Sequence, residues 1–531
     1  MGRRGLLGAA VAGWLGDVLA PASGPVRGRI VGGSCQAGHG LRRSFPAPSG
    51  PPERADVVIV GAGVAGASAA WRLAPTGLGV LLLELEPRLG GTSAWGEDGV
   101  VPYPWGAHYL PAPNPECRAA LRLLAEIGTV TAWDAAGWPI FDERRLCHAP
   151  QERLFYRGAW HPGLVPDDAL CGPERADMAR FQAIEDELTQ RRGADGRPAF
   201  QLPVERSSRD PELLALDRLS IAQWLDREGL RTPFVRWYVR LAVRDDFGGE
   251  LDNTSAWAAL HYFAARKLRT PQLSGSRYLV WPEGNGRLVQ AMLARAGAER
   301  RAGAMVTAVE PRAKGGVEVR YLDRARREMR RIEARAAVVA TPAFVARRLV
   351  QGTAAPLLPR RFAAPWLVAN LHLRERPDAE PCWDSLLYDG EGLGYVDAGH
   401  QRFVPGGPTV LTYFRAYGAS DVAASRAALL GASWAELASE ALGDLTPAHP
   451  DLGEKVERLD VMVHGHAMPQ PRPGFLGAEP FSPQPPIDRH VAWAHVDRTG
   501  MALFEEANLH GVRAAESIAD ALGAARGESW L

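Results

Sequence analysis

Three glycines and one glutamate are the residues whose types and spacing most clearly suggest chemistry. Gly61, Gly63 and Gly66 have the spacing G-x-G-x-x-G, and Glu84 follows roughly 20 residues later. In this pattern the first glycine permits a tight turn, the second lets the backbone approach a pyrophosphate, and the third lets a helix pack closely against a strand. The glutamate carboxylate accepts hydrogen bonds from ribose hydroxyl groups. The pattern therefore predicts a dinucleotide-binding site.

The elements needed to position these residues occur in the right order. Residues 56–60 (DVVIV) are a β-branched run typical of a buried parallel strand, and residues 67–73 continue the glycine turn as a helix. Residues 80–83 (VLLL) are a second apolar strand that ends at Glu84. The motif alone is a weak signal, whose alternative is a turn without a ligand. The complete order of strand, glycines, helix, strand and acid favours the binding site.

The residues after Glu84 distinguish between two kinds of dinucleotide. The run ELEPRLGGTS, with Arg88, Gly90, Gly91 and Thr92, resembles the extended fingerprint of the flavin amine oxidase, phytoene desaturase and protoporphyrinogen oxidase superfamily. In that superfamily the arginine and the glycine pair wrap the FAD diphosphate, and nicotinamide dehydrogenases generally lack the extension. The resemblance implies FAD, bound non-covalently because no cysteine stands at the places used for covalent flavin linkage.

Two later segments renew the resemblance. Residues 104–109 (PWGAHY) stand where the superfamily passes the chain along the isoalloxazine ring, although packing within a loop is an equal alternative for the rings of this segment. Residues 278–288 resemble the superfamily's P-x-G-G element and its helix, with Asn285 in place of the second glycine. The strand expected next includes Val306, whose backbone would hold the adenine edge.

The carboxy-terminal part resembles the last FAD motif of the superfamily. Residues 490–497 would be the final sheet strand, with Asp497 at the acid that meets the ribityl and diphosphate region, and a helix is expected at 511–522. Val496 and the pair Glu506 and Ala507 stand where the superfamily has a glycine and a Gly-Ala pair. The predicted FAD-binding residues are Gly61, Ala62, Gly63, Ala65, Gly66, Glu84, Arg88, Gly90, Gly91, Thr92, Trp105, Gly106, Ala107, His108, Val306, Asp497 and Phe504.

The order of these motifs predicts two interleaved domains of the α/β class. A Rossmann-like FAD-binding domain, doubly wound with a mostly parallel sheet, would take residues 55–114, 275–345 and 485–525. An α+β substrate domain, with helices and a mixed sheet, would take residues 115–274 and 346–484. Strand-like runs at 366–373, 410–414 and 456–464 would form the ceiling of the substrate cavity, and residues 115–271 are largely helix-patterned, with Ser220 as a helix N-cap. The aromatic-rich run at 231–265 packs in the core or lines an apolar tunnel, the first being the commoner use.

Catalytic residues are less well marked than the cofactor site. His464 and His466 lie on one side of the expected strand, but no third ligand is evident, so no metal is predicted. His466 and His108 are candidates for handling a proton, with a structural role as the alternative. Lys267 is the lysine of the substrate region, and many amine-oxidising relatives use a lysine that holds a water near flavin N5. Glu505 and Glu506 would lie near the flavin edge or cap the last helix.

Composition excludes several classes of protein. The 531 residues carry 61 basic and 61 acidic side chains, so no positive surplus favours nucleic acid as a partner. The five cysteines are scattered and contain no C-x-x-C pair, which argues against a disulfide framework or a zinc site.

The amino terminus resembles a twin-arginine export signal. Arg3 and Arg4 precede a weakly apolar run, at residues 6–19, that is too short for a membrane span. Residues 1–54 would then be signal and linker of a periplasmic or exported protein. The alternative is the unstructured start of a cytoplasmic protein.

The resemblance implies an FAD-dependent oxidoreductase of the amine oxidase type. It would transfer hydride from a C–N or C–C bond of a small molecule, an amine or an apolar polyene, to flavin N5, with reoxidation by oxygen or a quinone. The first alternative is a desaturase or porphyrinogen-type oxidase with a large apolar substrate. The second is a non-catalytic FAD-binding protein in an exported complex.

Overall fold

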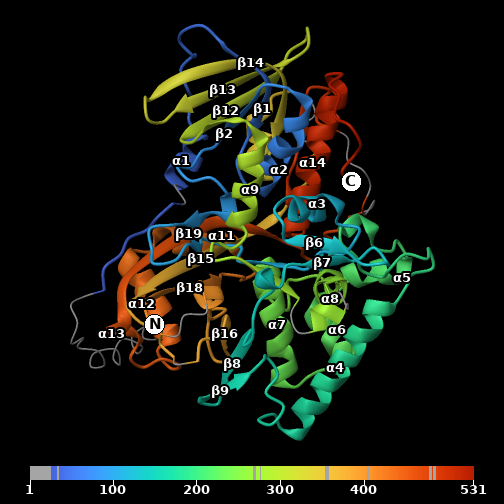
Figure 1. The fold of residues 1–531 in the computed structure, drawn as a ribbon, viewed down its shortest axis with the longest axis vertical. Helices are drawn as coiled ribbons and strands as arrows, with labels where there is room; N and C mark the ends of the chain where they lie inside the picture. Colours follow the sequence, from blue (N-terminus) through green and yellow to red (C-terminus); the bar gives the residue numbers. More distant parts are fainter. Residues whose placement is uncertain are drawn as a thin grey trace, which may run out of the picture.

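Two large sheets, each with its own helices, lie at opposite ends of the molecule's long axis (Figure 1). The computed structural model describes residues 26–32, 35–266, 271–274, 277–352, 358–378, 380–402, 406–477, 481 and 486–531. The predicted α/β class with a Rossmann-like sheet and a second, mixed sheet is confirmed. The expected export signal and Lys267 lie outside the described residues.

The first sheet has seven strands in the order β11-β2-β1-β14-β13-β12, and β20 pairs with β14. Their bounds are β1 Glu53–Val60, β2 Val80–Leu83, β11 Glu299–Arg301, β12 Ala304–Pro311, β13 Val317–Asp323, β14 Glu328–Val339 and β20 Val491–Trp493. The β11, β2, β1, β14 and β20 neighbours run parallel, while β12, β13 and β14 form an antiparallel meander. The apolar end of β1 is buried on both faces, as expected in a parallel sheet.

Helices cover both faces of this sheet. They are α2 Val64–Leu73, α3 Arg118–Glu126, α9 Gly286–Ala296, α10 Ala343–Leu349 and α14 Phe504–Ala521. A Cβ at Gly66 would lie 1.9 Å from the carbonyl oxygen of Gly61, so α2 can approach β1 only because residue 66 is glycine. A Cβ at Gly511 would lie 2.2 Å from the carbonyl oxygen of Ala65, so α14 packs against α2 in the same way.

The second sheet has the order β19-β15-β18-β17-β16-β8-β9. Its bounds are β8 Glu152–Tyr156, β9 Ala159–Pro162, β15 Phe362–Leu373, β16 Asp384–Leu387, β17 Tyr395–Asp397, β18 Thr409–Ala416 and β19 Val456–Gln470. Alternate residues of β15 face opposite sides, so Trp366 and Val368 pack on the inner face and Leu367 and Leu371 on the outer. The inner face is the ceiling of the cavities described below.

The remaining elements surround this sheet. The helices are α4 Gly172–Gln190, α5 Pro211–Leu214, α6 Ile221–Arg227, α7 Pro233–Phe247, α8 Ala256–Ala265, α11 Val422–Gly431, α12 Trp434–Leu445 and α13 Leu452–Lys455. Short strands are β3 Trp95–Gly96, β4 Tyr103–Pro104, β5 Tyr109–Pro111, β6 Val130–Trp133, β7 Pro139–Phe141 and β10 Tyr278–Val280. The Ser220 hydroxyl accepts from the Gln223 N–H and so caps α6, as predicted. Among the described residues no helix is both long and apolar enough to cross a bilayer.

The segment expected to be a linker instead extends the second sheet. The Val31 N–H donates to the Val461 carbonyl at 2.7 Å, and the Leu459 N–H donates to the Arg27 carbonyl at 2.8 Å. Helix α1 (Cys35–Gly40) follows. The difference has a physical reason, because β19 would otherwise leave an edge of unpaired backbone groups.

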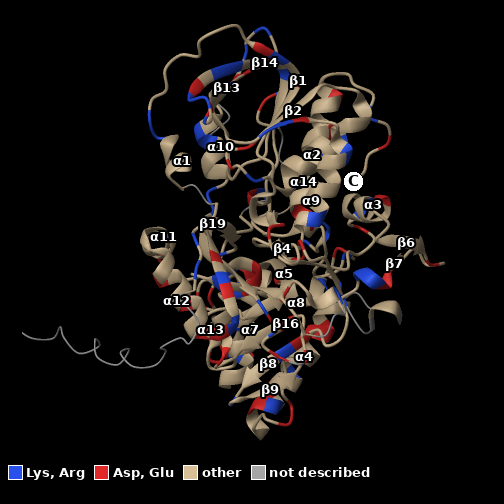
Figure 2. Cartoon of the chain, turned by 60° about the vertical axis from the view of Figure 1, so that its left-hand side comes forward, with Lys and Arg blue, Asp and Glu red and all other residues tan. Residues whose placement is uncertain are grey.

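Other differences concern element boundaries. Helix α14 begins at Phe504 instead of residue 511, because Gly511 is a packing position inside the helix rather than its start. The last strand is only Val491–Trp493. Strands β8 and β9 lie in the region that looked helical, where their pairing with distant β16 overrides the local pattern. Acidic and basic residues are mixed over the outer surface, as Figure 2 shows for β13 and β14.

A buried ion pair between α2 and α14 gives a stability prediction. Arg72 Nε donates to Glu516 Oε1 at 2.8 Å, and the two side chains are 1% and 8% exposed. We expect Glu516→Gln to lower the free energy of unfolding by about 3 kcal/mol at pH 7, because the buried Arg72 keeps its charge but loses the carboxylate that neutralises it. Urea denaturation of the purified protein measures this.

The control for this prediction is Glu212→Gln. Glu212 pairs with Arg191 at the surface and its side chain is 82% exposed, so its loss should cost at most about 1 kcal/mol. Equal effects of the two substitutions would contradict the assignment. Although burial opposes it, Ser529, Trp530 and Arg72 hold the pKa of Glu516 below its ordinary value, so this stabilisation is lost as the pH falls through that lowered pKa.

Candidate cofactor and substrate cavities

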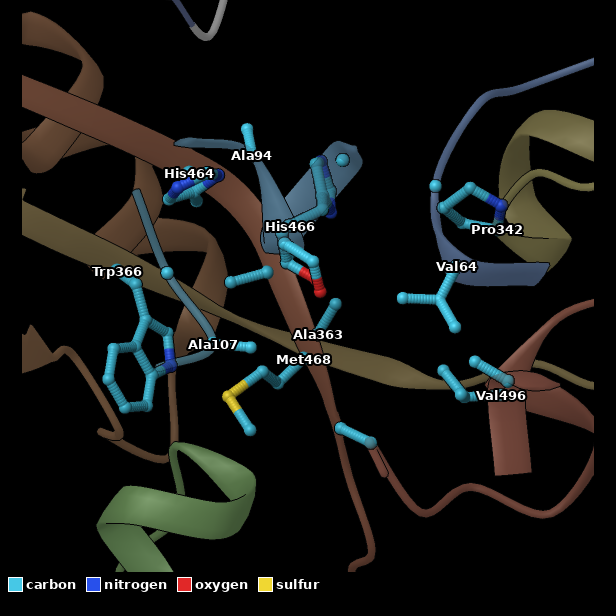
Figure 3. Close-up of a pocket in the computed structure, with 18 of the residues that line it drawn as sticks. Val64, Ala94, Ala107, Pro342, Ala363, Trp366, His464, His466, Met468 and Val496 are labelled. Carbon is cyan, nitrogen blue, oxygen red and sulfur yellow. The ribbon is translucent and has the colours of Figure 1, made fainter. Parts of the chain in front are cut away.

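A cavity of about 710 Å³ lies between the inner face of the second sheet and the start of α2. Figure 3 shows His464, His466 and Met468 of β19 on one side of it, and Val64 and Val496 on the other. The first sheet contributes the turn after β1, which is where open α/β sheets bind ligands. The volume is within the range of sites that hold organic cofactors.

The start of α2 is built as an anion site. Its N-cap is Gly63, no side chain caps it, and its first turn contains no acidic residue. Val64 and Ala65, the first helical residues, line the cavity. Free N–H groups and the helix dipole therefore favour a negatively charged group here.

The loop at Gly90 completes this anion site. The Gly90 N–H donates to the Ala62 carbonyl at 2.9 Å, and both Gly90 (φ 112°) and Gly91 (φ 58°) have left-handed backbone conformations that glycine adopts without strain. The nearest protein atom to a Cβ placed at Gly63 would be 3.9 Å away, so that Cβ would project into open cavity. The result is a backbone-lined cradle that a single methyl group would partly fill.

Glu84 is held beside this cradle by backbone groups. The Ala62 N–H donates to Glu84 Oε2 at 2.8 Å, and the Glu86 N–H donates to Oε1 at 2.9 Å. Burial raises the pKa of this carboxyl despite these hydrogen bonds. Each oxygen retains a second lone pair, so the side chain can also accept a hydrogen bond from a ribose hydroxyl.

Five buried polar atoms in the cavity wall lack hydrogen-bond partners among the described residues, and two of them, Asp246 Oδ2 and Arg266 Nε, belong to side chains that pair with each other through other atoms. The other three are Asn285 Oδ1, Trp366 Nε1 and Glu505 Oε1. All three residues line the cavity. Because unsatisfied buried polar groups are costly, their presence indicates a polar ligand. An anion cradle, a ribose acid and orphaned polar atoms in one cavity fit FAD.

Most predicted cofactor residues meet in this cavity. The lining residues among them are Gly63, Ala65, Glu84, Arg88, Gly90, Gly91, Thr92, Gly106, Ala107, His108, Asp497 and Phe504. Gly61, Ala62 and Gly66 form the turn behind the lining. Gly106 must be glycine, because its Cβ would lie 2.1 Å from the Thr92 carbonyl oxygen.

Two predicted cofactor residues lie elsewhere. Trp105 is 1% exposed in the core beneath the second sheet, and its contribution is the backbone carbonyl that accepts from His464 Nε2 at 2.8 Å. The bulky indole packs into the core while its small neighbours Gly106 and Ala107 face the cavity. Val306 is buried among the strands of the first sheet and does not line the cavity.

Asp497 is an ionised group in the cavity wall. Its Oδ2 accepts from the Ala343 N–H at 2.7 Å, at the start of α10. Burial alone would raise the pKa, but His495, this N–H and Arg361 hold it below the ordinary aspartate value.

The catalytic candidates occupy different places. His108 stacks on Phe414 with ring centroids 4.5 Å apart, and burial lowers its pKa to about 4, so its imidazole is neutral at pH 7. His466 contacts Phe344, and burial together with Arg426, His39 and Arg42 lowers its pKa to about 4. His466 lines the cofactor cavity and is absent from the wall of the second cavity.

The two glutamates at the start of α14 also separate. Glu505 lines the cofactor cavity, whereas Glu506 is fully buried and accepts from the Val204 N–H at 2.8 Å. Both lie in the first turn of α14, whose N-cap residue, Leu503, provides no side-chain hydrogen bond.

A second cavity of about 540 Å³ adjoins the first. The residues that line both are His108, Tyr109, Pro111, Asp245, Arg266 and Phe414. We call this shared wall the junction. Beyond the junction the second cavity continues under β8 and β16, between the rings of Tyr238, Tyr262, Tyr278 and Trp383.

The junction holds a carboxyl group, that of Asp245, whose pKa is raised. Tyr109 donates its hydroxyl to Asp245 Oδ2 at 3.1 Å. Burial, followed by the charge of Asp246, raises the pKa of Asp245 to about 7. Asp246 is itself paired with Arg266 at 2.8 Å, so this arginine is already neutralised. Asp245 can therefore exchange a proton near neutral pH.

Sequence reasoning missed the carboxyl groups of the second cavity. The sequence did contain a signal for one of them, because Asp245 and its neighbour Asp246 are adjacent acids near the end of α7. Acidic side chains are rarely buried without a partner. Of the aromatic run, Phe234, Phe247 and Trp257 pack in the core. Tyr238 and Tyr262 line the second cavity, but acidic and basic side chains line it as well, so it is not the apolar tunnel that was the alternative.

Comparison with known proteins supports the sequence resemblance. A family model of an NAD(P)-binding Rossmann-like domain matches residues 59–127. A protein of Mycobacterium tuberculosis (strain ATCC 25618 / H37Rv), provisionally named a flavin-containing monoamine oxidase, is 28% identical over 352 residues, which are 65% of this chain and 70% of that protein.

Solved structures share the whole fold at low sequence identity. Cyclohexylamine oxidase from Brevibacterium oxydans IH-35A has a TM-score of 0.63 at 18% identity, covering 88% of this chain and 100% of that one. Putrescine oxidase bound to putrescine has a TM-score of 0.62 at 16% identity, with the same coverage. A fatty acid isomerase from P. acnes has a TM-score of 0.57 at 16% identity, covering 87% of this chain and 98% of that one. The chain is thus similar in sequence to a protein provisionally named a flavin-containing monoamine oxidase, and it shares the fold of cyclohexylamine oxidase and putrescine oxidase.

Proposed function

We propose that this protein is an FAD-dependent oxidoreductase that oxidises amines. The observation that carries the proposal is the junction, where a carboxyl group, Asp245, lines both the cofactor cavity and the second cavity. An acid at this place suits a substrate with a basic nitrogen. The provisional name of the M. tuberculosis relative and the names of two structural neighbours, all amine oxidases, support the same chemistry.

The chain's own groups would hold FAD in three places. The α2 N-terminus with Gly90 and Gly91 would hold the diphosphate, and Glu84 a ribose. The atoms of Asn285, Trp366 and Glu505 that have no hydrogen-bond partner among the described residues would face the remaining part of the FAD molecule. When bound, FAD supplies the hydride acceptor that protein side chains lack.

The junction residues would prepare the substrate. An ionised Asp245 can take a proton from an ammonium group, leaving the neutral amine whose C–N bond can be oxidised. The rings of His108, Tyr109 and Phe414 exclude water, and the neutral His108 adds no repelling positive charge. Tyr109 orients the Asp245 carboxylate through its hydroxyl.

The residues that line the second cavity argue against a large apolar substrate. Four carboxyl groups, those of Glu152, Glu185, Asp245 and Asp384, line it. An apolar polyene would add no polar contact to these carboxyl groups, whereas a substrate with a basic nitrogen would. A desaturase or porphyrinogen-type oxidase is therefore the weaker proposal.

Two further properties complete the proposal. As electron acceptor we propose oxygen or a quinone, which oxygen uptake in the presence and absence of a soluble quinone distinguishes. The Arg3 and Arg4 pair supports export by the twin-arginine route. Replacing both with lysine should then keep the protein in the cytoplasm, and unchanged fractionation would contradict export by this route.

The first prediction concerns reduction of the bound flavin. The purified protein should show a flavin spectrum, and anaerobic addition of a suitable amine should bleach it, while apolar polyenes should not. Bleaching by polyenes alone would support the desaturase alternative. No bleaching by any amine or polyene would support a non-catalytic binding protein.

The second prediction concerns the cradle for the diphosphate. Gly63→Ala places a methyl group in open cavity, so the apoprotein should keep its unfolding midpoint while the Kd for FAD rises about tenfold. Gly66→Ala places its methyl group 1.9 Å from the Gly61 carbonyl oxygen, so it should lose about 1–3 kcal/mol of stability. FAD titration and thermal unfolding of both variants test this. Wild-type FAD affinity in Gly63→Ala would be evidence against the cradle.

The third prediction concerns pH. The value of kcat/KM for an amine should rise as the pH passes through about 7, because Asp245 loses its proton there. Asp245→Asn should remove this limb of the profile and lower kcat/KM about 100-fold. Tyr109→Phe should move the limb to higher pH, because the tyrosine hydroxyl lowers the pKa of Asp245. The account fails if Asp245→Asn keeps the wild-type profile.

A further inference from the structure

Two acidic residues lie next to each other in the ceiling of the second cavity. Strands β8 and β16 pair in parallel, and Glu152 is the Cα partner of Asp384. Residues paired in this way place their side chains on the same face of the sheet. Both side chains line the second cavity. Like charges in this position repel each other, so the pairing is unfavourable unless something positive lies between or beside them.

The protein supplies little positive charge to this pair. Neither carboxyl group forms an ion pair with a lysine or arginine within the ranges that the structure describes. A side-chain hydrogen bond with Tyr278 and then the charge of Arg277 favour ionisation of Glu152. Burial raises the pKa of both groups, and the charges of Glu152 and Asp245 raise that of Asp384 further. These raised pKa values favour the protonated forms of the pair in the absence of a cationic ligand, and a bound organic cation would favour the ionised forms.

Aromatic rings stand around the same pair. Tyr278 and Trp383 have ring centroids 5.8 Å apart, and Tyr109 lies 5.2 Å from Tyr278. Tyr238 completes this part of the lining. Ring faces attract ammonium and guanidinium groups, most strongly where water is excluded. Carboxylates and aromatic rings together are the groups that recognise an organic cation.

The acidic pair lies in the second cavity, beyond the junction. Glu152 and Asp384 line the second cavity and are absent from the wall of the cofactor cavity, whereas Asp245 lines both. The system thus has one acidic position at the junction and another beyond it. A substrate that filled both would carry one basic nitrogen at the junction and a second cationic group further in.

We propose that the substrate is an amine with a second cationic group, a diamine or an amine bearing a guanidinium, whose second group binds between Glu152 and Asp384. The inference rests on the proposed amine oxidation and adds the substrate class. The pair acts in binding, since it lies away from the cofactor cavity. The positive charge of the substrate would offset the mutual repulsion of the pair.

The test compares linear diamines of increasing length with monoamines of the same length. In the wild-type enzyme, kcat/KM should favour the best diamine over its monoamine at least tenfold. Asp384→Asn and Glu152→Gln should each reduce this ratio about tenfold, since an interaction with a charged group contributes about 1.5–3 kcal/mol. The surface substitution Glu212→Gln is the control and should keep the wild-type ratio. Arg277→Gln should increase the ratio, because it removes a competing cation.

Two readouts guard against misfolded variants. The absorbance spectrum of bound flavin reports an intact cofactor site, and the melting temperature without substrate should not fall in Asp384→Asn, because an amide of similar size replaces a buried carboxyl group whose pKa is raised. For the wild-type enzyme alone, a bis-quaternary ammonium ion should inhibit more strongly than a mono-quaternary ion of the same length. Equal inhibition by the two ions would overturn the second site.

The outcomes separate the two proposals. If diamines and monoamines reduce the flavin equally well in the wild-type enzyme and in both variants, the second cation site is overturned and amine oxidation stands. If neither series reduces the flavin, amine oxidation itself is overturned.

Discussion

The close contact between Gly66 and the carbonyl oxygen of Gly61 sets the geometry of the whole cofactor half. A side chain at residue 66 would collide with that oxygen at 1.9 Å, so glycine alone lets α2 begin directly after β1. This start leaves the first N–H groups of α2 facing the cavity and places the Ala62 N–H against Glu84. The anion cradle, the ribose acid and the packing of α14 on α2 all follow from this approach.

The second sheet converts that cofactor cavity into a reaction site by adding charge in an enclosed space. Its inner face is the ceiling of both cavities, and α7 contributes Asp245 where they meet. Carboxyl groups in such a place have raised pKa values because water no longer stabilises their charge. A basic substrate restores that stabilisation. Recognition of an amine and adjustment of its protonation are therefore two consequences of the same burial.

Local sequence patterns predicted the first sheet well, because the glycine motif and the strands at 56–60 and 80–83 are encoded by neighbouring residues. They could not predict the pairing of Glu152 with Asp384, which depends on the register of strands far apart in the chain. Part of the expected linker, residues 27–31, pairs with β19 because the edge of that strand offers unpaired backbone groups. The segment that contains Trp105 does line the cofactor cavity, through Gly106 and Ala107, but the Trp105 side chain itself packs in the core.

The central claim is that the C–N bond of an amine is oxidised next to the junction. Stopped-flow reduction under anaerobic conditions tests it most directly, with one reactive amine compared in ordinary form and deuterated at the carbon beside the nitrogen. The account predicts that the deuterated amine reduces the flavin several times more slowly, because the C–H bond breaks in that step. Equal rates with a product unchanged at that carbon, or no reduction by either form, would contradict it.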